Sequence, residues 1–261
     1  MLIDTHCHLD AAEFDGDRDA VLEAARVAGV GGFLVPAVCA DNFDAVAALS
    51  ASRRSCRHAL GIHPLYVQRA QESDLELLRA RLAEGAAVAV GEIGLDGFVA
   101  NGDMPLQRRY FEAQLKIARD FELPVVLHIR RAQDEILKYL RRIAVPGGIA
   151  HAFNGSRQQA EAFIKLGFRL GFGGAMSFEG SRRIRALAAS LPLSAIVLET
   201  DAPDMPPAWA GGQRNEPANL VRYARVLAEL RGMSVEEVIE ATGANALAAV
   251  PGLAALRQTE A

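Results

Sequence analysis

The stretch "AVAVGEIGLD" (residues 87–96) is an apolar run that ends in polar residues, and "PLQRRYFEAQLKIARDFE" (105–122) and "PVVLHI" (124–129) follow it. The first and third segments are short, continuous and rich in β-branched residues, which indicates buried strands. In the middle segment apolar residues recur at intervals of three and four, which indicates an amphipathic helix. This order predicts two parallel strands joined by a helical crossover.

The same alternation runs through the rest of the chain. Further strands are predicted at residues 2–6, 32–38, 58–63, 148–153, 168–174 and 195–200. Helical periodicity is clearest in "RDAVLEAARVAG" (18–29) and "SDLELLRARLAEG" (73–85). About eight strand and helix units in one chain of this size predict a (β/α)8 TIM barrel, with an open, doubly wound sheet as the competing fold. Because no linker or shift in composition divides the chain, we expect one barrel domain over residues 1–261.

Two helices are predicted after the last strand, at residues 216–232 and 234–250. Ser234 and Glu237 have the spacing of a capping box at the start of the second helix. We expect both helices to close the outside of the barrel.

The composition is that of an ordinary globular protein, with 51% hydrophobic residues and a formal net charge of −4. This charge argues against a broad basic coat for nucleic acid but allows basic residues around one site. The first predicted strand leaves no room for a signal peptide, and no run reaches the roughly 18 apolar residues of a membrane helix. Three cysteines without CxxC spacing are typical of a reducing compartment. We expect a cytoplasmic monomer without membrane association or an obligate protein partner.

Polar residues gather at the ends of the predicted strands, where TIM-barrel enzymes carry their active sites. They are His6, His8, His63, Glu92, Asp96, His128, His151, Glu199 and Asp201. One histidine alone is more often a core or surface residue than a ligand. Five histidines and several acids that converge on one rim, however, need partners for their polar atoms. Because imidazoles and carboxylates bind Zn, Mn or Mg, we expect a metal site there.

This set contains more donors than one tetrahedral ion can use. Two ions about 3.5 to 4 Å apart with a bridging carboxylate would use them, and such pairs are typical of phosphoester hydrolysis. Some barrel hydrolases bridge their metals with a carboxylated lysine, but Lys116, Lys138 and Lys165 all fall within predicted helices. Glu92 is the natural bridge instead.

Seven motifs of the chain resemble, in order and spacing, those of the TatD family of metal-dependent deoxyribonucleases, and most closely its YjjV-like branch. They are "IDTHCHLD" (3–10), "GIHP" (61–64), "GEIGLD" (91–96), "LHIRR" (127–131), "HAFNGS" (151–156), "LETDAPDMP" (198–206) and "RNEP" (214–217). The resemblance covers nearly the whole chain. The HxH pair is shared with the wider amidohydrolase-type barrels, whereas "GEIGLD" together with "LETDAP" narrows the choice to TatD.

The resemblance implies a role for each matching residue. One metal would be held by His6, His8, Glu92 and Asp201. The other would be held by Glu92, His128 and His151, with Glu92 as the bridge. Asp201 would also act as the acid/base, which makes Asp201 and Glu92 the catalytic candidates. His63 and Asp96 are similar to family site residues that lie near the substrate phosphate or behind the ligands.

Arginines follow the fifth, sixth and eighth predicted strands: Arg130, Arg131, Arg157 and Arg214. Guanidinium groups can grip phosphates, and we expect Arg130 and Arg214 to bind substrate, although a single arginine is more often surface charge. Trp209 and Phe14 lie in loops at the same end. They could stack on an unpaired base, but packing as loop anchors is the preferred interpretation.

The expected reaction is phosphodiester hydrolysis by a metal-bound hydroxide, with Asp201 accepting the proton of the attacking water. A deep pocket with few lysines favours an exonuclease-like action on DNA ends or single strands, with two divalent ions (Zn, Mg or Mn) per subunit. The alternative is a metal-dependent D-aminoacyl-tRNA deacylase or another small-ester hydrolase. A third hypothesis is a binding protein without turnover, against which Glu92 and Asp201 count because binding alone needs no base.

Overall fold

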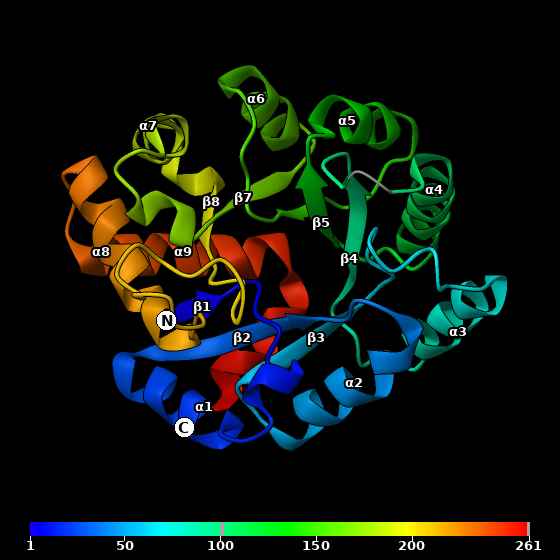
Figure 1. Cartoon of the computed structure of the whole chain (residues 1–261), viewed down its shortest axis with the longest axis horizontal. Coiled ribbons are helices and arrows are strands. Elements are labelled where there is room, and N and C mark those ends of the chain that lie inside the picture. Colours follow the sequence, from blue (N-terminus) through cyan, green and yellow to red (C-terminus); the bar gives the residue numbers. More distant parts are fainter. Residues whose placement is uncertain (100–101, 260–261) are drawn as a thin grey trace.

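The computed structural model describes residues 1–99 and 102–259. The strands of its parallel sheet follow the order of the sequence. They are β1 (Leu2–Asp4), β2 (Val30–Pro36), β3 (Cys56–Leu60), β4 (Ala89–Asp96), β5 (Val125–Arg130), β6 (Gly148–Ala150), β7 (Phe168–Phe172) and β8 (Ile196–Leu198). The sheet closes on itself, because the amide of Thr5 donates to the carbonyl of Leu198 at 3.1 Å. The predicted barrel is confirmed, and the open sheet is wrong (Figure 1).

Helices α1 to α7 alternate with the strands and, together with α8, surround the barrel (Figure 1). They are α1 (Arg18–Ala28), α2 (Phe43–Ser52), α3 (Glu72–Ala83), α4 (Met104–Asp120), α5 (Gln133–Arg142), α6 (Arg157–Lys165), α7 (Arg182–Ser190), α8 (Leu220–Arg231) and α9 (Val235–Ala249). Short 3-10 helices are η1 (Ala12–Phe14), η2 (Ala40–Asn42), η3 (Gly174–Ser177), η4 (Leu193–Ala195), η5 (Pro217–Asn219) and η6 (Pro251–Thr259). Among the described residues, no helix combines the length and the apolar character that crossing a membrane requires.

Helix α9 begins with the predicted capping box. The amide of Glu237 donates to the Ser234 hydroxyl at 3.2 Å, and the Glu237 carboxylate accepts the amide of Ser234 at 2.9 Å. These bonds satisfy two amides that the first turn of a helix otherwise leaves without partners.

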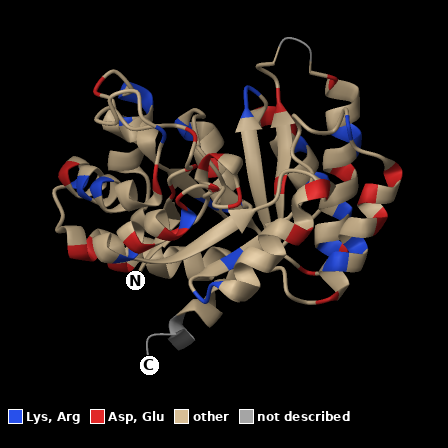
Figure 2. Ribbon diagram, turned by 60° about the horizontal axis from the view of Figure 1, so that its bottom comes forward, with Lys and Arg blue, Asp and Glu red and all other residues tan. Residues whose placement is uncertain are grey.

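The prediction that the last two helices close the outside of the barrel is wrong for α9. Helix α8 does lie outside, against α7. Helix α9 and η6 instead close the end at which the strands begin, and Figure 2 shows the C-terminal segment below that end. A second apolar cluster forms there from inward-facing strand residues and the C-terminal segment: Ile3, Leu34, Ala59, Ala89, Val126, Ile149, Val197, Ala246, Ala249, Val250, Leu253 and Leu256. Ala59 and Ala89 of the sheet belong to this cluster together with Leu253 and Leu256 of η6.

Several strands end earlier than their apolar runs do. The strands β1, β6 and β8 were predicted to reach residues 6, 153 and 200, but they end at Asp4, Ala150 and Leu198. Directly beyond the strands, Arg131, Ala152 and Asp201 have positive φ angles of 53°, 44° and 59°. The left-handed conformation costs a residue with a side chain about 1–2 kcal/mol. At these points the backbone leaves the ladder and turns its side chains toward the mouth of the barrel.

Candidate metal centre

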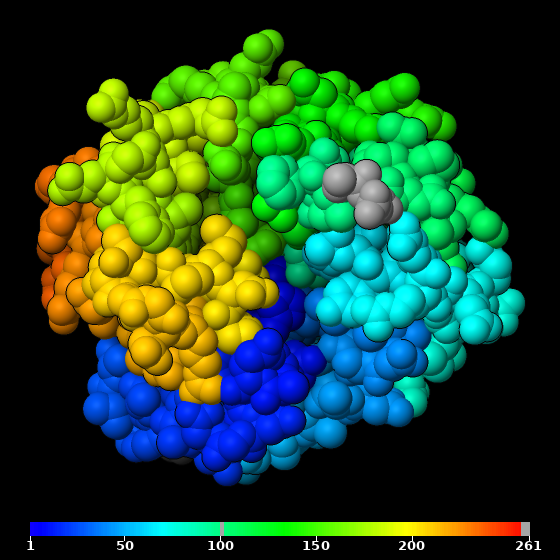
Figure 3. All heavy atoms as spheres, in the orientation of Figure 1, coloured from blue at the N-terminus to red at the C-terminus, as the bar shows by residue number. Residues whose placement is uncertain are grey.

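A cavity of ≈ 1240 Å³ opens at the end of the barrel where the strands finish. Figure 3 shows the surface hollowed at its centre, where the N-terminal segment (blue) and the loop after β8 (yellow) meet the green and cyan segments. The cavity is lined by strand-end residues that the sequence singled out: His8, His63, Glu92, Asp96, His128, His151 and Asp201. His6 is fully buried beneath them.

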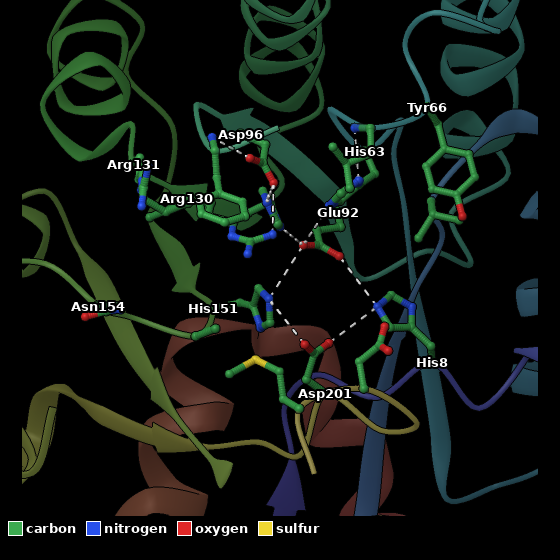
Figure 4. A pocket seen from close by; sticks show the side chains of 18 of the residues that line it. His8, His63, Tyr66, Glu92, Asp96, Arg130, Arg131, His151, Asn154 and Asp201 are labelled. Carbon is green, nitrogen blue, oxygen red and sulfur yellow. Dashed lines mark hydrogen bonds and ion pairs between the residues drawn. The ribbon is translucent and has the colours of Figure 1, made fainter. Parts of the chain in front are cut away.

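The first donor group surrounds the Nε2 atoms of His6 and His8, which lie 3.2 Å apart. Oε2 of Glu92 is 3.1 Å from Nε2 of His6 and 3.6 Å from Nε2 of His8. Oδ1 of Asp201 is 3.6 Å from both nitrogens. Both histidines lie just beyond the end of β1, in the segment that turns toward the cavity. Figure 4 shows Asp201 facing both Glu92 and His8 across the cavity.

The second donor group surrounds the other oxygen of Glu92. Oε1 lies 2.9 Å from Nδ1 of His128, 3.5 Å from Nε2 of His63 and 3.7 Å from Nε2 of His151. The two oxygens of Glu92 therefore face different imidazoles. His63, expected near the substrate phosphate or behind the ligands, approaches Glu92 as closely as the expected ligand His151 does.

These donors fit divalent metal ions. Ligand atoms lie within 4.8 Å of one another in each of three sets: His6, Glu92 and His151; His6, His8 and Asp201; and His63, Glu92 and His128. The facing Nε2 atoms of His6 and His8 share at most one proton, and the carboxylates beside them only accept. A cation satisfies all of these lone pairs, and nitrogen and oxygen donors suit Zn, Mn or Mg.

Two carboxylates lie behind the histidines. Oδ2 of Asp96 is 3.1 Å from Nε2 of His128, and Oε1 of Glu199 is 3.1 Å from Nδ1 of His151. Glu199 also accepts the amide of Ala152 at 2.5 Å. Carboxylates in this position fix the tautomer and orientation of metal-binding histidines. The sequence had singled out Glu199 at a strand end without giving it a role.

Asp4 joins the segments after β1 and β8, which carry His6, His8 and Asp201 of the first donor group. Its carboxylate accepts the amides of Thr200 at 2.9 Å and His6 at 3.3 Å, and the Thr200 hydroxyl at 2.6 Å. Burial raises the pKa of Asp4 to about 8, although these hydrogen bonds oppose the rise. Because Asp4 holds the backbone next to both His6 and Asp201, it fixes where those side chains begin.

Burial and charge shift the pKa values of the site in different directions. For His151, burial alone would lower the pKa, but the carboxylates of Glu199 and Asp201 raise it to about 10. Burial raises the pKa of Asp201 to about 6, against the pull of His151 and His8. Burial would also raise the pKa of Glu92, yet the surrounding imidazoles hold it well below its usual range. Both acids therefore carry charge near neutral pH.

The structure does not bring Arg214 to the cavity. Its guanidinium lies 4.7 Å from the centre of the Phe14 ring and donates to the carboxylate of Asp17. Phe14 is fully buried, and Nε1 of Trp209 donates to Asn219 at 2.9 Å, so both aromatic residues pack as loop anchors. The long loop after β8 folds back over the N-terminal segment and carries Arg214 away from the donors.

Arg130 and Arg131 do line the cavity, as their place after β5 predicts. Arg157 is instead paired with a glutamate of its own helix, α6, on the exposed surface. Sequence reasoning missed Phe98 and Arg183, which also line the cavity. Only their position in the long loop after β4 and near the start of α7 could have indicated them.

The chain is similar to known proteins over most of its length. A family model described as TatD related DNase matches residues 3–250. The uncharacterized metal-dependent hydrolase YjjV of Escherichia coli (strain K12) is 43% identical over 242 residues, 92% of this chain and 93% of its own. Human deoxyribonuclease TATDN3 is 33% identical over 270 residues, 98% of this chain and 97% of its own.

A solved structure agrees with these comparisons. The crystal structure of YjjV, the TatD homolog from Escherichia coli K12, matches with a TM-score of 0.93 at 41% identity. The match covers 96% of this chain and 98% of that chain. The chain therefore belongs to the TatD related DNase family of metal-dependent hydrolases.

Proposed function

We propose that the chain is a phosphodiesterase that uses two divalent metal ions to remove nucleotides from DNA ends or single strands. The observation that carries this proposal is the position of Glu92, whose two oxygens face two separate sets of imidazoles. A carboxylate so placed suits the bridge of a dinuclear site. The description of the family model and the name of human TATDN3 support DNA as the substrate.

The residues divide between the two ions as follows. His6, His8 and Asp201 would hold one ion together with Glu92. Nε2 of His6 and Nε2 of His8 lie 3.1 to 3.6 Å from Oε2 of Glu92 and Oδ1 of Asp201. His128 and His151 would hold the other ion with Oε1 of Glu92. When bound, divalent ions lower the pKa of water toward neutrality and offset charge on phosphate oxygens.

Asp201 is the proposed proton acceptor. Its Oδ1 faces His6 and His8 at 3.6 Å and its Oδ2 faces His151 at 3.9 Å, so it lies between the two donor groups. A carboxylate whose pKa is about 6 is ionised at neutral pH and still basic enough to take a proton. The proton would rest on Asp201 and pass to the leaving group.

The shape of the cavity supports action at chain ends. The cavity at the mouth of the barrel has a volume of ≈ 1240 Å³, which is more than one nucleotide fills. Its walls enclose a bound group on several sides, which suits the end of a chain better than the middle of a duplex. Arg130 and Arg131 supply cations at the rim. We also propose a cytoplasmic monomer, a location that the free thiols of Cys7, Cys39 and Cys56 support.

The test combines metal analysis with cleavage of 3′-labelled single-stranded DNA, with and without a chelator. Two equivalents of metal and stepwise shortening that stops on chelation are expected. Intact DNA together with deacylation of D-aminoacyl-tRNA would overturn the nuclease in favour of the acyl hydrolase. One equivalent of metal with full DNA cleavage would overturn the dinuclear arrangement.

A further inference from the structure

The charges around the cavity mouth are divided between two sides. Arg130 and Arg131 follow β5, and Arg183 near the start of α7 donates to Asn154, which follows β6. The acids at the rim come instead from the loops after β1 and β8: Asp10, Glu13 and Asp204. In a barrel whose strands follow the order of the sequence, β5 lies opposite β1. Figure 4 shows the labelled arginines on the side away from His8 and Asp201.

Phe98 joins the two arginines on the basic side. The guanidinium of Arg130 lies 3.9 Å from the centre of the Phe98 ring, and that of Arg131 lies 4.5 Å from it. The Phe98 side chain is 46% exposed, which is unusual for so large an apolar residue. An aromatic ring attracts such cations through its quadrupole and leaves their N–H groups free to donate.

The two guanidinium groups differ from the other arginines that follow strands. Arg214 and Arg157 are bound to carboxylates within 3.3 Å. Arg130 comes no closer than 3.9 Å to Asp96, and within residues 1–99 and 102–259 no carboxylate forms an ion pair with Arg131. The ring therefore orients both cations without neutralising them, as a clamp for an anion requires.

Phe98 is itself tied to the candidate metal centre. Its amide donates to Oδ1 of Asp96 at 2.8 Å, while Oδ2 of the same carboxylate faces Nε2 of His128 at 3.1 Å. Asp96 is held in turn by Gln107, whose side chain accepts the Asp96 amide at 2.8 Å. The clamp is thus fixed relative to the histidines, at one side of the place where the reacting phosphate would lie.

We propose that Phe98 is a positioning residue that holds Arg130 and Arg131 as a clamp for a second phosphate, next to the one that is cleaved. This inference rests on the proposed function and narrows its substrate. The substrate is an oligonucleotide with a further phosphate on the β5 side, whereas the acids on the opposite side repel a chain that continues there. A phosphodiester without a neighbouring phosphate gains nothing from the clamp.

The experiment compares kcat/KM for the thymidine tetranucleotide and for bis(p-nitrophenyl) phosphate, with saturating Mn²⁺. Phe98→Leu should lower kcat/KM for the tetranucleotide about tenfold more than for the small diester, mainly through KM, because two cation–π contacts are lost. It should also flatten the salt dependence for the tetranucleotide. Phe98→Tyr keeps an aromatic ring at this position, so it should leave the ratio of the two kcat/KM values and the salt dependence as in the wild-type protein. Phe178→Leu is the matched control, since Phe178 is 44% exposed and does not line the cavity, and it should leave the ratio unchanged.

Two results separate the failure of this inference from that of the proposed function. If the wild-type protein with bound metal cleaves neither compound, the proposed function fails and the clamp fails with it. If the wild-type protein cleaves both and Phe98→Leu lowers both equally, only the clamp is overturned. The triple variant Phe98→Leu/Arg130→Met/Arg131→Met gives a second test, because it should be no worse on the tetranucleotide than Arg130→Met/Arg131→Met if the ring acts only through these two arginines.

Discussion

Replacing Glu199 by glutamine tests how the carboxylates behind the histidines act on the metal centre. The substitution keeps the size of the side chain and removes one negative charge, 3.1 Å from Nδ1 of His151. Glu199 is only 2% exposed, and within the described residues its Oε2 has no hydrogen-bond partner. Its charge therefore acts mainly on His151 and on the amide of Ala152.

Two effects of this substitution oppose each other. Loss of a carboxylate behind a ligating histidine typically weakens metal binding by about 10- to 100-fold, because the imidazole becomes a poorer donor. The same carboxylate, however, raises the pKa of His151 to about 10 together with Asp201, so in the wild-type protein a metal ion must displace a proton from that ring. Without Glu199 the pKa of His151 falls and this competition weakens.

The balance of the two effects changes with pH. Below a pH of about 10, one displaced proton strengthens wild-type binding by about tenfold per pH unit, or about 100-fold from pH 7 to pH 9. Glu199→Gln should show a shallower slope. It should bind metal nearly as well as wild type at pH 7, where easier loss of the proton compensates, and about two- to tenfold more weakly at pH 9, where little of that compensation remains.

Competition with a chromogenic chelator at several pH values measures this, and calorimetry in buffers of different ionisation enthalpy counts the protons released. Asp204→Asn is the matched control, because it removes the same charge from an exposed residue at the rim and should leave the slope as in wild type. A Glu199→Gln protein with the wild-type slope and affinity would refute the argument that Glu199 acts through His151.

Three further substitutions test other parts of the structure. Asp201→Asn should lower kcat for DNA cleavage by about 10²- to 10⁴-fold at saturating metal, and full activity would exclude Asp201 as the base. Asp4 has a folded pKa raised from 3.8 to about 8, so its contribution to stability is present below pH 3.8 and is lost as the pH rises through 8. Asp4→Asn should remove this decline in the free energy of unfolding, measured in urea at a series of pH values. Leu253→Ala should lower the free energy of unfolding by about 2–5 kcal/mol in urea, since this fully buried leucine closes the lower end of the barrel.

The fold could be predicted because its pattern is local and repeated. Buried parallel strands are apolar on both faces, and the helices between them have one apolar face. Each strand and helix unit can therefore be recognised from its hydrophobic pattern. The position of α9 could not be predicted in the same way. Helical periodicity identifies a buried face but not the surface that it meets, and Ala246 and Ala249 of α9 fit the narrow lower end rather than the outer ring.

The ligands could be predicted because topology brings strand ends together whatever the intervening loops do. Glu92 lies within β4, and His8 and Asp201 lie within four residues of the ends of β1 and β8, so closing the barrel brings the three to one end. Arg214 lies 13 residues beyond Asp201 in a long loop, and its position depends on partners such as Asp17 that no local pattern reveals. The contacts of Phe98 with the two arginines also join different loops and could be found only in the structure.

Left-handed residues beyond β5, β6 and β8 help to shape the site. At Arg131, Ala152 and Asp201 the chain leaves the sheet in a left-handed conformation, and each such residue costs about 1–2 kcal/mol. The apolar clusters that fill the lower end and surround the sheet offset this cost. Asp201 has one of these positive φ angles, and its carboxylate faces both donor groups, with Oδ1 3.6 Å from Nε2 of His6 and of His8 and Oδ2 3.9 Å from Nε2 of His151. The left-handed turn beyond β8, which the apolar run did not indicate, is therefore the point at which the backbone directs Asp201 into the site.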